Sequence, residues 1–213
     1  IDMTVVRDTV SVDTVYSKVL NPDIGYIRIT DFGQKTDVDF KNQLDRLTAD
    51  GIKGLIIDLR NNPGGMLTTV VNIADELLPE GVILTVRDKS GKENQYKSNN
   101  DCMSVPMCVL INGNSASASE VLSGAIRDHG RGKLIGEKSF GKGVVQSIVE
   151  FGDGSAFKLT TAKYYTPSGE CIDQTGIKPD IEVKLGDAAS KKQISELTLE
   201  EDEQLRTALQ VLN

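Results

Sequence analysis

The sequence predicts an α/β fold in which βαβ units build a mainly parallel sheet. Residues 54–59 and 107–111 are short runs that are apolar along their length, which is typical of strands buried on both faces. Segments of ten or more residues that carry one apolar stripe alternate with such strands, as at residues 36–50 and 66–78. Because strands and helices alternate, we expect right-handed crossovers between parallel strands.

The first half of the chain gives the clearer elements. Residues 3–15 alternate polar and apolar side chains, which predicts one or two edge strands. Residues 25–30 form the next predicted strand, and Thr36 can cap a helix that Gly51 closes. A second helix follows the turn at residues 63–65 and ends before a proline. The apolar stripes of these two helices are Phe40, Leu44 and Leu47, and Val70, Ile73 and Leu77.

The second half of the chain continues the alternation of strands and helices, and a predicted hairpin then follows. Its predicted elements are a strand at 82–86, a polar loop at 88–104, a strand at 107–111, a helix at 115–129 and a strand at 134–136. Residues 144–151 and 155–165 flank a Gly-Asp-Gly turn, which predicts a hairpin. Residues 186–193 are small and polar, as in a linker, and residues 198–212 predict an acidic amphipathic helix. Its apolar residues are Leu199, Leu205, Leu209 and Leu212.

Length and charge exclude several classes of protein. A chain of 213 residues suits one sizeable core with a small appendage better than two equal domains. With 24 Lys and Arg against 31 Asp and Glu, the net charge of -7 argues against nucleic acid and anionic membranes as partners. No apolar run approaches the roughly 18 residues that span a bilayer, so stable membrane insertion is not expected.

The three cysteines do not predict a disulfide framework, because their number is odd and no C-x-x-C pattern occurs. Free thiols are expected, and a bridge between Cys102 and Cys108 stays open. The chain opens on Ile1 without a signal pattern, which is typical of a piece of a longer product.

A candidate nucleophile lies where a buried strand gives way to a helix, within residues 112–120. Parallel α/β sheets bind ligands at such carboxyl ends of strands. Ser117 would lie in the first turn of the helix, where unpaired N–H groups and the helix dipole stabilise a developing anion. The alternative is that these small residues only cap the helix and permit close packing.

The single histidine is a poor base for this serine. His129 lies twelve residues after Ser117, which along an unbroken helix is about 18 Å. It is better interpreted as a C-terminal helix residue that complements the helix dipole, so a Ser-His-Asp triad is not expected.

Lysine is the other base that serves serine, provided that an apolar surrounding keeps it neutral. Lys142 lies between two glycines, and the apolar residues beside it are Phe140, Val144 and Val145. In an extended segment Gln146 would share the strand face of Lys142 and could orient its amine. The alternative is an ordinary solvated lysine.

The turn at residues 63–65 is a candidate oxyanion hole, in addition to the candidate nucleophile and base. Two glycines after a proline leave backbone N–H groups exposed, in a form suited to one wall of an oxyanion hole. A plain turn between strand and helix is the alternative. Just before this turn, Asp58 and Arg60 could form a structural ion pair.

Together these motifs resemble the protease domain of the carboxyl-terminal processing peptidases, or tail-specific proteases, which are Ser-Lys peptidases of family S41. The resemblance covers most of residues 1–183. The motifs that carry it are GYIRI (25–29), LIIDLRNNPGG (55–65), SASASE (115–120), GEKSFGKGVVQ (136–146), YYTPSG (164–169) and GIKPDIEV (176–183).

The resemblance implies roles for individual residues. It makes Ser117 the nucleophile, Lys142 its general base and Gln146 the residue that orients the base. The oxyanion hole would be formed by the backbone N–H groups of Gly65 and Ala118. No cofactor and no metal belong to this prediction.

The resemblance also implies a ClpP/crotonase-like core, with a small cap region built from the terminal segments. Residues 1–185 would form the protease core with its N-terminal strands, and residues 186–213 the linker and cap helix. A PDZ domain usually precedes this core in the family, and the resemblance predicts none within residues 1–213. The implied substrates are proteins with apolar C-termini, the implied location is extracytoplasmic, and assembly into a homo-oligomer stays open.

Two other functions are alternative hypotheses. The chain could be a non-catalytic peptide-binding or assembly module in which Lys142 stays charged and misplaced. An acyl-CoA enzyme of the crotonase type shares the fold and the glycine turn, but its chemistry usually needs a glutamate base and no covalent serine.

Overall fold

The main sheet confirms the predicted α/β class. The computed structural model describes residues 3, 12–21, 23–99 and 102–213. Six strands follow the order β1-β2-β3-β6-β7-β10, and every neighbouring pair is parallel except β1 with β2. They are β1 (Val15–Asn21), β2 (Ile24–Ile29), β3 (Gly54–Asp58), β6 (Met107–Ile111), β7 (Gly132–Gly136) and β10 (Ile181–Glu182).

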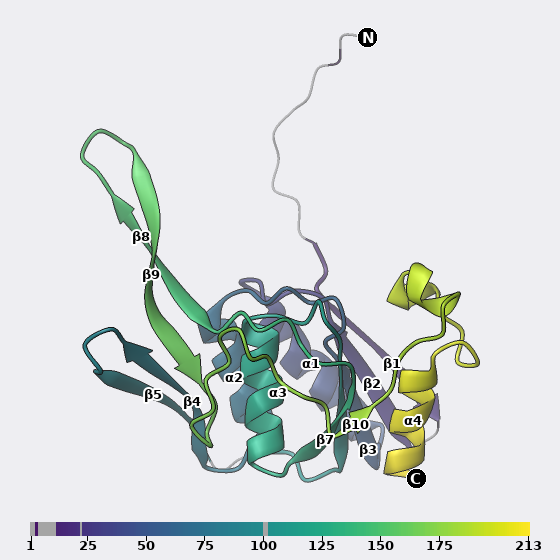
Figure 1. Cartoon of the computed structure of the whole chain (residues 1–213). Coiled ribbons are helices and arrows are strands. Elements are labelled where there is room, and N and C mark those ends of the chain that lie inside the picture. The colour runs from purple at the N-terminus through teal and green to yellow at the C-terminus, as the bar shows by residue number, and fades with distance from the viewer. Residues whose placement is uncertain (1–2, 4–11, 22, 100–101) are drawn as a thin grey trace.

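Helices cover both faces of the main sheet (Figure 1). They are α1 (Thr36–Ala49), α2 (Leu67–Leu77), α3 (Ala118–Asp128) and α4 (Glu203–Leu212). The first three pack on one face, where Ile27 and Ile57 belong to the larger apolar core. On the other face α4 packs against Tyr26 and Ile56. Successive strand residues point to opposite faces, which is why strands covered on both sides are apolar throughout.

A second, antiparallel sheet of four strands has the order β5-β4-β9-β8. Its strands are β4 (Gly81–Asp88), β5 (Glu93–Ser98), β8 (Val144–Glu150) and β9 (Ala156–Tyr165). The predicted hairpin of β8 and β9 is present and projects from the body as a long arm (Figure 1). Its turn is closed by the Phe151 N–H, which donates to the Ser155 carbonyl at 2.7 Å.

The prediction of a continuous polar loop at residues 88–104 is wrong, because β5 lies within it. This strand pairs with β4 at the edge of the second sheet, and most of its side chains are exposed. A solvated edge strand needs no apolar alternation, so the sequence carries no periodic signal for it. Of the predicted strand region at 3–15, residues 4–11 lie outside the described residues, and β1 begins at Val15, where that region ends.

Helix starts differ from the predictions by a few residues. Helix α3 begins at Ala118 instead of residue 115, with Ser117 as its N-cap. Helix α4 begins at Glu203 instead of residue 198, because Asp202 caps it by accepting a hydrogen bond from the Leu205 N–H. Lys35, not Thr36, is the N-cap of α1. The predicted linker contains the 3₁₀ turn η1 (Ala189–Lys191), and η2 (Ile194–Glu196) follows it.

The cysteines are free thiols, as expected. Cys108 is buried beneath α4, and burial raises the pKa of its thiol to about 11. In the part of the chain that the structure describes, no helix has the length and apolar character needed to cross a membrane.

Candidate active site

Ser117 stands at the start of α3, behind the carboxyl end of β6. Its backbone has φ 55° and ψ −111°, in a region that non-glycine residues seldom adopt. Such a conformation costs about 1–3 kcal/mol and is kept only where the surroundings enforce it. Ser117 is half-buried, whereas Ala116 and Ala118 on either side are buried. The strained corner therefore presents a serine at the helix N-terminus.

The glycine turn packs directly on this corner. A Cβ atom on Gly64 would lie 2.9 Å from Ser117 Cβ and 3.0 Å from the Ala118 nitrogen. A Cβ atom on Gly65 would lie 2.4 Å from the Phe32 carbonyl oxygen. Both glycines also have positive φ, 106° and 146°. Close approach and backbone conformation thus both require glycine at these two positions.

Asn62 fastens the glycine turn to its neighbours. This buried side chain accepts a hydrogen bond from the Gly64 N–H at 2.8 Å and donates one to the Ile29 carbonyl at 2.9 Å. The Asn62 carbonyl accepts from the Ala116 N–H and from the Ser119 hydroxyl, both at 3.0 Å. The turn after β3 and the start of α3 are therefore held as one unit.

Two backbone N–H groups in this unit are free. Among the hydrogen bonds of the described residues, neither the Gly65 nitrogen nor the Ala118 nitrogen is a donor. Ala118 is the first residue of α3, where an N–H group has no partner within the helix. Two free donors beside a serine can stabilise an oxyanion on a carbonyl that the serine attacks.

Glu120 connects Ser117 with the loop that contains Lys142. Its fully buried carboxylate accepts four hydrogen bonds. One oxygen accepts from the N–H groups of Ser117 and Lys142, each at 2.8 Å. The other accepts from the Ser139 hydroxyl at 2.6 Å and the Gly141 N–H at 2.7 Å. Sequence reasoning gave Glu120 no role, although serine followed three residues later by glutamate is the pattern of a capping box.

Replacing Glu120 with glutamine is expected to lower the free energy of unfolding by about 1–3 kcal/mol, because the amide nitrogen cannot accept hydrogen bonds and leaves buried donors unsatisfied. Denaturant titration measures this loss. Hydrogen exchange adds the location: the N–H groups of Gly141 and Lys142 should exchange faster in the variant.

Glu150→Gln on exposed β8 is the matched control and should change neither quantity. Unchanged exchange at Gly141 and Lys142 in Glu120→Gln would contradict this account.

The side chains of Lys142 and Gln146 are both exposed, and among the hydrogen bonds of the described residues none joins Lys142 Nζ to Ser117. The expected apolar enclosure of Lys142 is absent, because the side chain of Phe140 is 66% exposed. The glycines on either side of Lys142 are needed for close packing of the loop. A Cβ on Gly143, for example, would lie 2.2 Å from the nitrogen of Asp173. These glycines let the loop approach a neighbouring segment and do not enclose the lysine.

The expected ion pair of Asp58 and Arg60 is present and belongs to a buried cluster. Arg60 Nη2 lies 2.6 Å from Asp58 and 2.8 Å from Asp202, and Arg60 Nη1 also donates to Gln204 at 3.0 Å. Tyr26 donates its hydroxyl proton to Asp58 at 2.7 Å. Burial by itself raises the pKa of Asp58, but the charge and hydrogen bonds of Arg60 outweigh it and hold the pKa below its ordinary value. The cluster joins the end of β3 to the start of α4.

This cluster makes the protein acid-sensitive. A carboxylate with a lowered pKa stabilises the fold above its ordinary pKa of 3.8, and the contribution is lost as the pH falls below that value. Asp58→Asn should lower the free energy of unfolding at pH 6 by about 3–5 kcal/mol, because it leaves Arg60 with a broken buried pair.

Denaturant titrations between pH 6 and pH 3 test this prediction. The variant should lose less stability over that interval than the wild type, and the control Asp187→Asn, at an exposed carboxylate, should follow the wild type. Parallel curves for the wild type and Asp58→Asn would contradict it.

His129 lies at the opposite end of α3 from Ser117, as its C-cap, with Nε2 2.8 Å from the Val82 carbonyl oxygen. It is therefore not placed to serve the serine. Among the described residues, no group of three or more His, Cys, Asp or Glu side chains could hold a metal ion.

Comparisons with known proteins all find similarity to peptidases. The model of peptidase family S41 matches residues 23–183. A carboxy-terminal-processing protease of Bartonella bacilliformis is 42% identical over 193 residues, which cover 86% of this chain and 44% of that protein. A chloroplastic C-terminal processing peptidase of Tetradesmus obliquus is 37% identical over 162 residues, which cover 75% of this chain and 35% of that protein.

A solved protease structure is also similar to this chain. The structure of a photosystem II D1 C-terminal processing protease matches with a TM-score of 0.77 and 33% sequence identity. The match covers 84% of this chain and 50% of that one. The chain thus spans half the length or less of these relatives.

Proposed function

Since the chain belongs to peptidase family S41, we propose that it is a serine endopeptidase in which Ser117 is the nucleophile and Lys142 the general base. Gln146 orients the lysine, and the N–H groups of Gly65 and Ala118 form the oxyanion hole. Lysine is an established base for nucleophilic serine when it acts in its neutral form.

The observation that carries the proposal is the packing of the glycine turn on the serine corner. A Cβ on Gly64 would lie within 3.0 Å of both Ser117 and Ala118, so the turn and the serine are in contact. The two nitrogens proposed as oxyanion donors donate to no other group among the described residues. Donors that are already in place need no rearrangement when charge develops on the attacked carbonyl oxygen.

The reaction follows from these groups. Neutral Lys142 takes the proton of the Ser117 hydroxyl, and the serine oxygen attacks the scissile carbonyl. The tetrahedral intermediate collapses, the amine leaves with a proton from the lysine, and water releases the acyl group. For this chemistry the amine of Lys142, whose side chain is exposed, must reach the Ser117 hydroxyl. Glu120 already holds the lysine backbone in the same hydrogen-bonded unit as the serine.

We further propose that the substrates are proteins with apolar C-terminal tails and that the site is extracytoplasmic. Support comes from relatives named as C-terminal processing enzymes, one of them chloroplastic. A peptide lying extended beside a strand would be held by main-chain hydrogen bonds, while a few pockets select apolar side chains. Residues 186–213 would form part of a cap region, since α4 packs on the main sheet.

Cleavage of an unstructured protein with an apolar tail tests the function. The tail ends in Leu-Ala-Ala, and a matched substrate ends in Asp-Lys-Asp. We expect cleavage near the apolar tail only, with a rate that rises from pH 6 to pH 10 because the lysine acts when deprotonated. Equal cleavage of both substrates would overturn the tail preference, and no cleavage of either would overturn the peptidase for this chain.

The second candidate is a non-catalytic peptide-binding module, which the exposure of the Lys142 side chain favours. It predicts that the apolar-tailed substrate binds saturably and stays intact at every pH. Measuring binding and cleavage on the same samples separates the two functions.

A further inference from the structure

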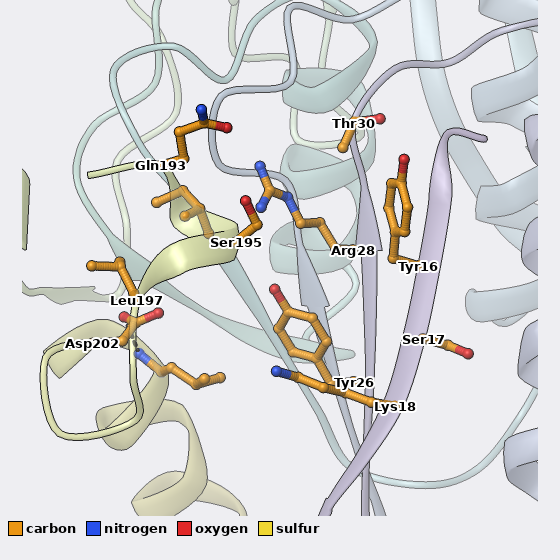
Figure 2. Close-up of a pocket in the computed structure, with 12 residues that line it drawn as sticks. Tyr16, Ser17, Lys18, Tyr26, Arg28, Thr30, Gln193, Ser195, Leu197 and Asp202 are labelled. Atoms are coloured by element: carbon orange, nitrogen blue, oxygen red, sulfur yellow. Dashed lines mark hydrogen bonds between the residues drawn. The ribbon is translucent and has the colours of Figure 1, made fainter. Parts of the chain in front are cut away.

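A cavity of 510 Å³ lies on the α4 side of the main sheet, away from the face that α1, α2 and α3 cover. It opens between strands β1 and β2, at one edge of the main sheet, and the segment 193–205 (Figure 2). Its volume falls in the range of small-molecule sites, about 300–1,000 Å³. The catalytic proposal uses none of the residues that line it.

Arg28 points from β2 into this cavity, toward Ser195 on the opposite wall (Figure 2). Its neighbours along the strand, Ile27 and Ile29, belong to the apolar core on the other face of the sheet. Within the described residues, the buried Nε of Arg28 has no hydrogen-bond partner. A buried donor without a partner costs free energy that a bound acceptor would recover.

The carboxylate that lines the cavity, Asp202, makes no hydrogen bond to Arg28 among the described residues and is bound to another arginine. Asp58 and Asp202 both pair with Arg60. Lys18, at the edge of the cavity, lies 5.2 Å from the ring centre of Tyr26. Two cations, Lys18 and Arg28, and one carboxylate, Asp202, line the cavity, which leaves one positive charge in excess in a chain whose net charge is -7.

The uncharged part of the lining includes apolar surface, which limits the kind of anion that fits. Tyr26, Ile194, Leu197 and Leu205 provide aromatic and aliphatic surface. A single excess positive charge matches a carboxylate of charge −1 better than a phosphate group of charge near −2. Guanidinium groups also bind carboxylates through two parallel hydrogen bonds.

We propose that this cavity binds the carboxylate of an apolar acid, with the carboxylate on Arg28 and the apolar part against Leu197 and Leu205. An acid of this chemistry is either a free small molecule or the last residue of a peptide. The proposal does not rest on peptidase activity, and binding is measured in the Ser117→Ala protein so that no peptide is consumed.

The probe is N-acetyl-L-leucine, with N-acetyl-L-leucinamide as the uncharged match, titrated calorimetrically into the full chain. We expect the acid to bind saturably and at least about tenfold more tightly than the amide, as hydrogen bonds to charged groups require. Arg28→Gln should abolish the difference between acid and amide. Arg87→Gln, which alters an exposed arginine paired with Glu93, should keep it.

A second variant protects the test against misfolding of Arg28→Gln. Ser195→Trp fills the cavity from an exposed position and leaves β2 unchanged, so it should lose binding of the acid while its thermal unfolding matches the wild type. Equal binding of acid and amide, no saturable binding of the acid, or equal losses in Arg28→Gln and Arg87→Gln would overturn the proposal.

Two peptides then distinguish the sources of the carboxylate. One ends in a free leucine carboxylate, and the other has the same sequence with an amidated end. Tighter binding of the free-ended peptide than of N-acetyl-L-leucine assigns the cavity to chain ends. Binding of N-acetyl-L-leucine without binding of either peptide assigns it to small acids, and both results support a carboxylate site.

Discussion

Ser117→Ala and Lys142→Ala should each lower the rate of tail cleavage by at least about 10⁴-fold, because removing one member of a nucleophile–base pair disables the pair. The serine variant lacks the attacking oxygen. The lysine variant keeps that oxygen but has no group to take its proton. Rates come from appearance of the shortened protein, measured by mass spectrometry at pH 9.

Lys138→Ala is the matched control for the lysine, since Lys138 is also exposed and lies four residues earlier in the same loop. It should cleave at the wild-type rate. If Lys142→Ala retained more than about a tenth of the wild-type rate, another group would be the base, and the exposed position of Lys142 would be its working state.

Gly65→Ala is expected to cost about 10²- to 10³-fold in the rate of cleavage, which is the usual loss when one oxyanion donor is displaced. The new Cβ would lie 2.4 Å from the Phe32 carbonyl oxygen and 2.7 Å from its carbonyl carbon, both backbone atoms that cannot rotate away. The turn must therefore shift, and its N–H group moves with it. Overpacking should also lower the free energy of unfolding by about 1–3 kcal/mol.

Gly152→Ala is the control for a glycine-to-alanine change, because no atom lies within 4 Å of a Cβ built there. It should leave rate and stability unchanged. The two effects of Gly65→Ala are separated by measuring cleavage well below its melting temperature. A folded Gly65→Ala protein with the wild-type rate would show that Gly65 is not an oxyanion donor.

The α/β fold could be predicted because its strands are buried on both sides. Residues 54–58 and 107–111 are fully buried, and a strand of this kind is recognised from apolar character alone. Strand β5 could not be predicted, since its residues are polar and its place depends on pairing with β4. The late start of α4 has a similar origin: Asp202 is fixed by Arg60, 142 residues earlier in the chain.

Site residues that belong to a short sequence motif could be predicted, whereas contacts between segments distant in the sequence could not. Ser117 and Gly65 follow from a helix start and a glycine turn at the ends of buried strands. Three of the four hydrogen bonds of Glu120 join segments about twenty residues apart, so the local capping-box pattern reveals only the bond from Ser117. An apolar enclosure of Lys142 would depend on packing between segments, and the lysine is exposed in this structure.

The central claim is that Ser117 attacks a carbonyl whose oxyanion the Gly65 and Ala118 N–H groups bind. The most direct measurement is the intact mass of the protein after reaction with a peptidyl fluorophosphonate ending in leucine, followed by peptide mapping. The account predicts one adduct, located on Ser117, that is absent in Ser117→Ala and forms at least about tenfold more slowly in Gly65→Ala. An adduct on another residue, or an equal rate in folded Gly65→Ala, would contradict it.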